Sequence, residues 1–168
     1  TQNSETLTVN STSVVSTTSG FKTVTFNAAT TEFLQVNALA GDDIIDVTPS
    51  PTTSIFVDGG DPIGSNPGDR IVLHPPGAYI LEPGPENDEG GLNSAGALRV
   101  SWDHIEGVTI VGGGPGVILG TNGDDDITVI ARYSSTHVGA DGVQDFTVTV
   151  NDGPELYFVD QPFLFIEA

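Results

Sequence analysis

Short apolar runs recur along the whole chain, and no window places apolar residues at helical spacing over ten or more positions. The runs are rich in β-branched and aromatic residues and are separated by Gly, Pro, Asn and Asp, a pattern typical of strands and turns. About thirteen runs at roughly ten-residue spacing predict an all-β domain. They are KTVTF, EFLQV, DIIDV, SIFVD, RIVLH, AYILE, ALRVSW, GVTIV, GVILG, DITVIA, DFTVTV, ELYFV and FLFIE.

The bends between these runs favour one all-β architecture. Many runs lead through a Gly- or Asp-rich turn of two to six residues into the next run. This is typical of a parallel β-solenoid, or β-helix-like fold, in which each strand turns a corner and stacks on the rung below. Two-residue hairpin signals are scarce, and Asn122-Gly123 is the clear one. An antiparallel β-sandwich is the alternative, because strand spacing alone fits both.

The length of 168 residues suits one domain with a real core. We expect a single β-solenoid domain over 21–168, preceded by a Ser/Thr-rich segment, 1–20, that could pair as a strand with a neighbouring subunit. Internal similarity supports such pairing, because FLQVNA at 33–38 matches FLFIEA at 163–168. Open strand edges at two related ends would be templates for head-to-tail assembly.

The charge balance excludes several classes of partner. The chain has 23 acidic and four basic residues and a formal net charge of −19. Such a charge destabilises the compact state unless cations compensate it, and it excludes binding to nucleic acid and anionic membranes. No apolar stretch is long enough for membrane insertion, and the absence of cysteine excludes thiolate metal sites and thiol catalysis. The Ser/Thr-rich composition favours secretion.

Carboxylates gather in Gly-rich turns directly before strands, and this pattern predicts calcium sites. Ca²⁺ takes six to eight oxygen ligands at about 2.4 Å from carboxylates, carbonyls and water. Stacked rungs lie about 4.8 Å apart, so neighbouring turns could share an ion. Ordinary solvated Asx turns are the alternative interpretation of each motif. The first candidate ligands are Asp42, Asp43, Asp124 and Asp125, followed by Asp58, Asp61, Asp69 and Asp126.

Two of these turns carry a family resemblance. AGDDIIDV at 40–47 and NGDDDITV at 122–129 resemble single degenerate copies of the hemolysin-type (repeats-in-toxin) calcium-binding repeat, and DGGDPIGSNPGDRIVL at 58–73 is similar. The unit is not repeated back to back here, so the tight β-roll of that family is not implied. The blocks also resemble long tandem-repeat bacterial surface proteins. These resemblances imply secretion to the cell surface, calcium binding and a structural or adhesive role, and they supply no catalytic residue.

Other motifs give no catalytic constellation. The Gly-rich segment 108–120 leads into another strand and has no P-loop Lys, so it predicts a tight turn. Trp102 is favoured as a packed strand aromatic over a sugar platform. The three histidines lack metal-ligand spacing, and a lyase mechanism would have only two nearby arginines to draw on. These residues are His74, His104, His137, Arg70 and Arg132.

The sequence therefore predicts a secreted, calcium-binding structural module, without enzymatic activity, of a cell-surface array or extracellular filament. It would assemble end to end with identical subunits or adjacent repeats. One alternative is a calcium-dependent carbohydrate-binding or adhesion module with extracellular polysaccharide as its partner. Another is a polysaccharide-degrading β-helix enzyme.

Overall fold

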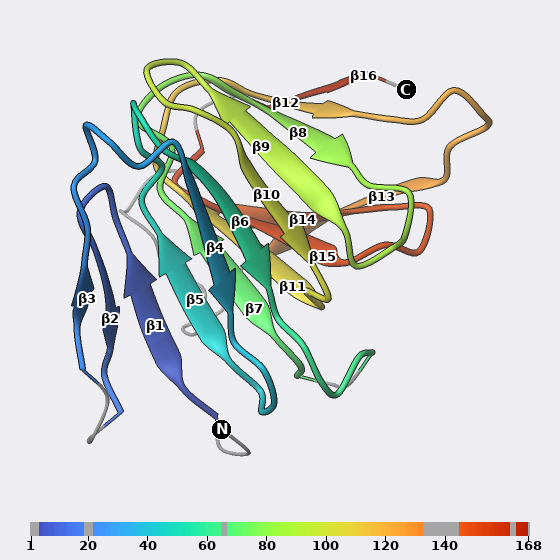
Figure 1. The fold of residues 1–168 in the computed structure, drawn as a ribbon. Coiled ribbons are helices and arrows are strands. Elements are labelled where there is room, and N and C mark those ends of the chain that lie inside the picture. The colour runs from blue at the N-terminus through green and yellow to red at the C-terminus, as the bar shows by residue number, and fades with distance from the viewer. Residues whose placement is uncertain (1–3, 19–21, 65–66, 133–144, 162–163, 168) are drawn as a thin grey trace.

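A computed structural model describes residues 4–18, 22–64, 67–132, 145–161 and 164–167. The chain forms two mixed β-sheets, neither of which closes on itself, and no helix occurs in these residues. The all-β prediction is confirmed. Within the same residues there is accordingly no helix long and apolar enough to cross a membrane. Figure 1 shows the two sheets as layers of one folded unit.

Sheet A has nine strands and sheet B has seven in the described part of the chain. Sheet A runs in the order β13 (Ile127–Arg132), β14 (Asp145–Val150), β15 (Glu155–Val159), β11 (Gly107–Val111), β7 (Arg70–Leu73), β5 (Ile44–Val47), β1 (Thr6–Val9), β2 (Ser13–Ser16) and β3 (Val24–Thr25). Sheet B runs in the order β16 (Leu164–Glu167), β12 (Gly116–Leu119), β8 (Tyr79–Pro83), β9 (Gly90–Ser94), β10 (Val100–Asp103), β6 (Ser54–Asp58) and β4 (Phe33–Asn37).

The chain passes back and forth between the two sheets. Strands β1, β5, β7, β11 and β15 form a parallel series in sheet A. In sheet B, β4 pairs in parallel with β6 and β6 with β10, while β8 pairs in parallel with β12 and β12 with β16. Each pass thus stacks on the preceding one (Figure 1).

Antiparallel strands occur at three places, at the two ends of the parallel series in sheet A and once within sheet B. The β2–β3 hairpin extends sheet A beyond β1, and the β13–β14 hairpin extends it beyond β15. In sheet B, β9 lies between β8 and β10 and is antiparallel to both, so this one pass contributes three strands. Sheet B is widened by that pass. The β13–β14 hairpin widens sheet A at its β15 end, where Phe146 stacks on Phe158 with ring centroids 5.1 Å apart.

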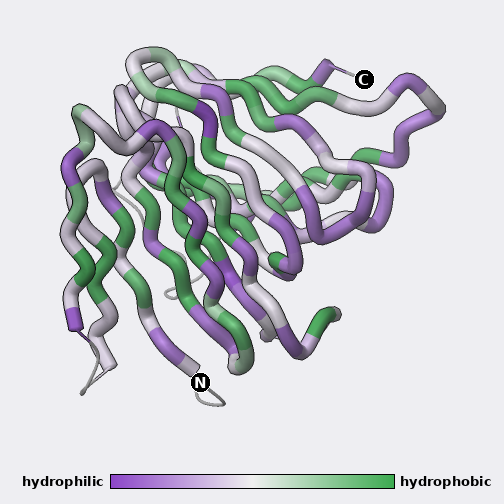
Figure 2. The backbone as a smooth tube through the Cα atoms, in the orientation of Figure 1, coloured by the Kyte–Doolittle hydropathy of each residue, from purple (hydrophilic) through white to green (hydrophobic). Residues whose placement is uncertain are grey.

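The core consists of apolar columns that cross the parallel strands. Side chains alternate along each strand, and Figure 2 shows apolar and polar positions alternating. In sheet B, Trp102 is 4% exposed and lies in register with Val57, so the prediction of a packed strand aromatic is confirmed. One fully buried column of sheet A consists of Val9, Val47, Leu73, Ile110 and Phe158.

Each of the thirteen predicted runs contains a strand, whereas β1, β2 and β9 were not among them. Strand β9 lacks β-branched residues and packs beneath Trp102, where a Cβ on Gly90 would lie 2.5 Å from the indole Cζ2. Segment 1–20 contributes β1 and β2 to sheet A of its own chain. Asn122-Gly123 was wrongly interpreted as a hairpin, because it lies between strands of different sheets. The turn predicted within 108–120 is confirmed between β11 and β12.

Two adjacent isoleucines of β5 test this alternation. Ile45 is fully buried, whereas Ile44 is 42% exposed on the opposite face. We expect Ile45→Ala to lower the free energy of unfolding by about 2–5 kcal/mol because it leaves a cavity in the core. Ile44→Ala is expected to cost less than about 1 kcal/mol. Urea titration followed by tryptophan fluorescence measures both, and equal losses would contradict the register of β5.

Candidate functional site

Four carboxylates lie in one line along the inner side of sheet A. Glu5, Asp43, Asp69 and Glu106 each directly precede one of the parallel strands β1, β5, β7 and β11. The first residues of these strands pair in register, so the residues before them are neighbours as well. Because side chains alternate, the four point to the same side as the core-packing residues two positions further on. We name these four residues the carboxylate column.

Backbone N–H groups connect the column from strand to strand. The N–H of Glu5 donates to Asp43 Oδ1 at 2.6 Å, and the N–H of Asp43 donates to Asp69 Oδ1 at 2.6 Å. The N–H of Asp69 donates to Glu106 Oε2 at 2.7 Å, and Glu106 Oε1 accepts from the N–H of Gly64 at 2.6 Å. Three of the carboxylates therefore each satisfy a backbone donor at the start of the neighbouring strand.

The second carboxylate oxygens of Asp43 and Asp69 have no hydrogen-bond partner among the described residues. Asp43 is 1% exposed and Asp69 is fully buried. Asp69 Oδ2 faces Gly59, where an added Cβ would lie 2.8 Å from this oxygen and 2.1 Å from the carbonyl oxygen of His104. A carboxylate oxygen and a carbonyl oxygen thus face the same glycine. A buried, unpartnered carboxylate oxygen is costly unless a proton or a cation compensates it.

Burial shifts the titration of both aspartates in the same direction. Loss of hydration raises the pKa of Asp69 to about 6, and the hydrogen bond from the Asp43 N–H offsets only part of this effect. The pKa of Asp43 is also raised, again mainly by burial and further by neighbouring carboxylates. Near neutral pH the column therefore holds charge at a cost in stability. This buried charge can be compensated by a bound proton at low pH and by a bound hard cation at neutral pH.

A second group lies where β6 and β10 end. Among the described residues, one group of three His, Asp or Glu ligand atoms falls within 4.8 Å: Asp88, Asp103 and His104. His104 Nδ1 and Asp58 Oδ1 are 2.9 Å apart, and this hydrogen bond is the main reason that the pKa of His104 is raised. Only Ile105 separates His104 from Glu106 in the sequence, so this group adjoins the carboxylate column. It offers oxygen and imidazole ligands at a half-buried position.

The acidic turn between β12 and β13 satisfies its own hydrogen bonds. Asp125 accepts hydrogen bonds from the N–H and Oγ1 of Thr121 and from Asn151 Nδ2. These contacts lower the pKa of Asp125. The N–H of Asp126 donates to Asn151 Oδ1 at 2.8 Å, and Asp124 is exposed. Side-chain hydrogen bonds within the turn and to Asn151 therefore satisfy Asp125 without a cation.

Seven of the eight predicted ligands lie in segments that lead from a sheet-B strand to the next sheet-A strand, and Asp58 is the last residue of β6. Asp43 and Asp69 belong to the column, and Asp58 contacts His104. Asp42 is half-buried beside Asp43, whereas Asp61 is exposed and its backbone pairs with Leu39 and Gly41. The structure therefore brings Asp43 and Asp69 together and places Asp124, Asp125 and Asp126 on a separate turn.

The sequence prediction missed Glu5, Glu106, Asp88, Asp103 and His104 as site residues. The column acids share a sequence pattern, an acid, then any residue, then an apolar residue, in ETLTV, DIIDV, DRIVL and EGVTI. EFLQV at 32–36 and DDITV at 125–129 have the same pattern outside the column, so the pattern alone does not identify it. No comparable pattern marks the group around His104. His74 Nε2 lies 3.2 Å from Asp46 Oδ2 at the surface, and His137 lies outside the described residues.

No protein-family model, curated protein sequence or solved structure matches this chain. The resemblance to calcium-binding repeats therefore remains a prediction from the quoted turns.

The raised pKa of Asp69 predicts how stability depends on pH in the absence of divalent cations. The folded chain holds this proton more tightly than the unfolded chain, whose Asp titrates near 3.8. The stability contributed by the proton is therefore complete below about pH 4 and is lost as the pH rises through 6, a change on the order of 3 kcal/mol. In EGTA, we expect Asp69→Asn to match the wild type near pH 4 and to exceed its stability at pH 8. Urea titrations across this range measure the difference, and parallel pH profiles of the two proteins would contradict it.

Proposed function

We propose that the chain is a secreted, calcium-stabilised β-solenoid module that serves as a structural unit of a cell-surface array or extracellular filament. The carboxylate column is the observation that carries this proposal. It places two buried carboxylates with unpartnered oxygens on neighbouring strands of a chain with net charge −19. Adjacent buried charges of one sign require compensation. We assign the module a scaffold role without catalysis.

The path of the chain supports a solenoid over an antiparallel sandwich. Five strands of sheet A form an uninterrupted parallel series, and between consecutive members the chain visits sheet B. A Greek-key sandwich is built from antiparallel strands. The antiparallel strands present here lie in hairpins at the ends of sheet A and within one widened pass of sheet B.

The ligand chemistry supports calcium over other cations. Carboxylate and carbonyl oxygens are hard donors, and a site built from loops does not impose the compact octahedron that Mg²⁺ demands. In this proposal Asp43 and Asp69 supply carboxylate oxygens and His104 supplies its carbonyl. Extracellular modules bind Ca²⁺ at roughly 10⁻⁴–10⁻³ M, so a site of modest affinity fills after export. Ion binding then stabilises the folded state by linkage.

Sheet B is where a further copy or an adjacent repeat would continue the stack. In sheet A the parallel series is closed by antiparallel strands, β2 at one end and β14 at the other. Within the residues that the structure describes, the outermost strands of sheet B, β4 and β16, each pair on one side only. The two strands run in the same direction. They also contain the matching sequences FLQVN and LFIE. Parallel edges of related sequence favour end-to-end pairing of identical units.

Removal of calcium tests the proposed function. We expect 10 mM Ca²⁺ to raise the melting temperature over that in EGTA by roughly 5–10 °C at neutral pH, which corresponds to a ligand present at about 100 times a Kd of about 10⁻⁴ M. Asp43→Asn and Asp69→Asn should each remove most of this increase because they remove a proposed ligand charge. Differential scanning calorimetry measures the shift.

The matched control is Glu32→Gln, which removes one negative charge at an exposed position outside the column. It should keep the full calcium-dependent increase. An unchanged melting temperature of the wild type in EGTA would overturn the calcium proposal. A loss of the increase that is equal in all three variants would assign it to general screening of charge.

The absence of cysteine permits a direct test of assembly. Gln35 of β4 and Phe165 of β16 occupy matching positions in the two similar sequences. A mixture of Gln35→Cys and Phe165→Cys proteins should form mixed disulfide dimers under mild oxidation in calcium, because parallel pairing of the edges brings the thiols together. Each variant oxidised alone is the control. If mixed dimers form no faster than dimers of either variant alone, β4 and β16 do not pair.

A further inference from the structure

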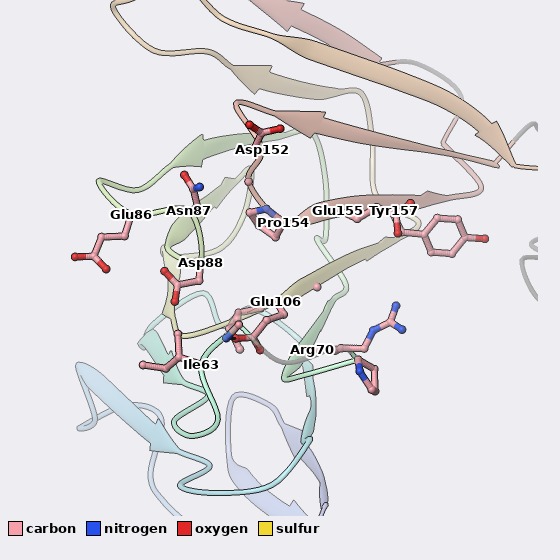
Figure 3. Close-up of a pocket in the computed structure, with 15 residues that line it drawn as sticks. Ile63, Arg70, Glu86, Asn87, Asp88, Glu106, Asp152, Pro154, Glu155 and Tyr157 are labelled. Carbon is pink, nitrogen blue, oxygen red and sulfur yellow. Dashed lines mark hydrogen bonds between the residues drawn. The ribbon is translucent and has the colours of Figure 1, made fainter.

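An open cleft lies at the starts of β7, β11 and β15, between these strand starts of sheet A and the β8–β9 turn of sheet B. Its volume is about 790 Å³, within the range of roughly 300–1,000 Å³ that is usual for small-molecule sites. Figure 3 shows Glu86 and Asn87 of the β8–β9 turn on one side, Arg70 and Tyr157 on the other, and Glu106 between them. Strand starts and two loops thus form one concave surface outside the hydrophobic core.

Arg70 has its hydrogen-bond donors free in this cleft. Arg99 pairs with Glu82 and Arg132 pairs with Glu155, but among the described residues Arg70 has no carboxylate oxygen within 4.0 Å. Its stem lies across Gly107, where an added Cβ would be 3.3 Å from both Cγ and Nε. The glycine therefore allows the guanidinium to cross β11. An unpaired arginine is notable in a chain with 23 acids.

The cleft also presents free acceptors. Glu86 and Asp152 are exposed on the two loops that border it, and the side chains of both have no hydrogen-bond or ion-pair partner among the described residues. Glu155 is neutralised by Arg132, and Glu106 is held by backbone N–H groups. The cleft thus combines a free planar donor, free carboxylates and the amide of Asn87.

Tyr157 completes the cleft with an aromatic ring. Its hydroxyl donates to Asp145 Oδ2 at 3.2 Å, and burial together with this carboxylate raises its pKa to about 12. The ring is therefore neutral and held in place on the outer face of β15. A fixed aromatic ring beside polar groups can pack against the apolar C–H face of a polyhydroxylated ligand.

We propose that this cleft binds a neutral oligosaccharide. A sugar hydroxyl both donates and accepts, so the same ligand satisfies Arg70 and the carboxylates of Glu86 and Asp152. A uronate would satisfy Arg70 but meet several carboxylates, and a polycation would satisfy the carboxylates but meet Arg70. The cleft shares Glu106 with the carboxylate column, but Asp43 and Asp69, whose second oxygens carry the proposed function, do not line it. We therefore expect sugar binding without calcium.

A glycan microarray that carries both neutral and uronate-containing oligosaccharides tests the proposal. The labelled full chain is applied in calcium and again in EGTA, below its melting temperature in each. We expect retention of neutral glycans under both conditions. Arg70→Ala and Asp152→Ala should each weaken binding by roughly tenfold or more, because each removes hydrogen bonds to a charged group. Arg70→Lys should recover only part of the affinity, because it lacks the planar fork.

Arg99→Ala is the matched control, since Arg99 pairs with Glu82 outside the cleft. It should bind as the wild type does, and melting temperatures establish that all variants fold. The cleft proposal is overturned if no neutral glycan is retained, if uronate glycans are preferred, or if Arg70→Ala binds as tightly as Arg99→Ala. If neutral glycans are retained in EGTA but calcium does not change the melting temperature, the calcium-stabilised function is rejected. The proposal that the cleft binds a neutral oligosaccharide is then still supported.

Discussion

The in-register parallel pairing of β1, β5, β7, β11 and β15 is the constraint on which the rest of the structure depends. Parallel register places equivalent positions of successive strands side by side. Apolar positions thereby meet apolar positions and form the two inner columns of sheet A. By the same rule the acid before each of the first four strands meets another acid, so the carboxylate column follows from the stacking that builds the core.

The column is part of the backbone structure as well as a charged feature. Its carboxylates accept the N–H groups at strand starts, where a donor would otherwise be buried without a partner. The cost appears on the second oxygens of Asp43 and Asp69, which remain buried and unpartnered. In Asp43 and Asp69, the hydrogen bond accepted by one oxygen stabilises the folded state, whereas the buried charge on the other oxygen destabilises it. This opposition couples the folded state to protons and cations.

Strand positions could largely be predicted from the sequence, whereas the partners of each strand could not. Apolar runs with turn residues between them indicate strands locally. Strand β9 was not recognised because it begins with two glycines, of which Gly90 lies against Trp102 and Gly91 against Arg99. The same limit applies to the site. Asp124–Asp126 and Asp43 look alike in sequence, but only Asp43 precedes a strand that stacks on another acid-led strand. Glu5 and Glu106 belong with Asp43 because of a register that is set by tertiary pairing.

The position of the column also protects the alignment of the strands. A slip of two residues keeps every inward side chain inward, so the apolar pattern alone does not penalise it. In sheet A such a slip would place Asp69 beside Ile45, or in the other direction Asp43 beside Ile71, and both isoleucines are fully buried. A carboxylate within an apolar column costs far more than one beside another strand's N–H group. The same acids that destabilise the folded state by their buried charge therefore also favour the observed register of sheet A over a register slipped by two residues.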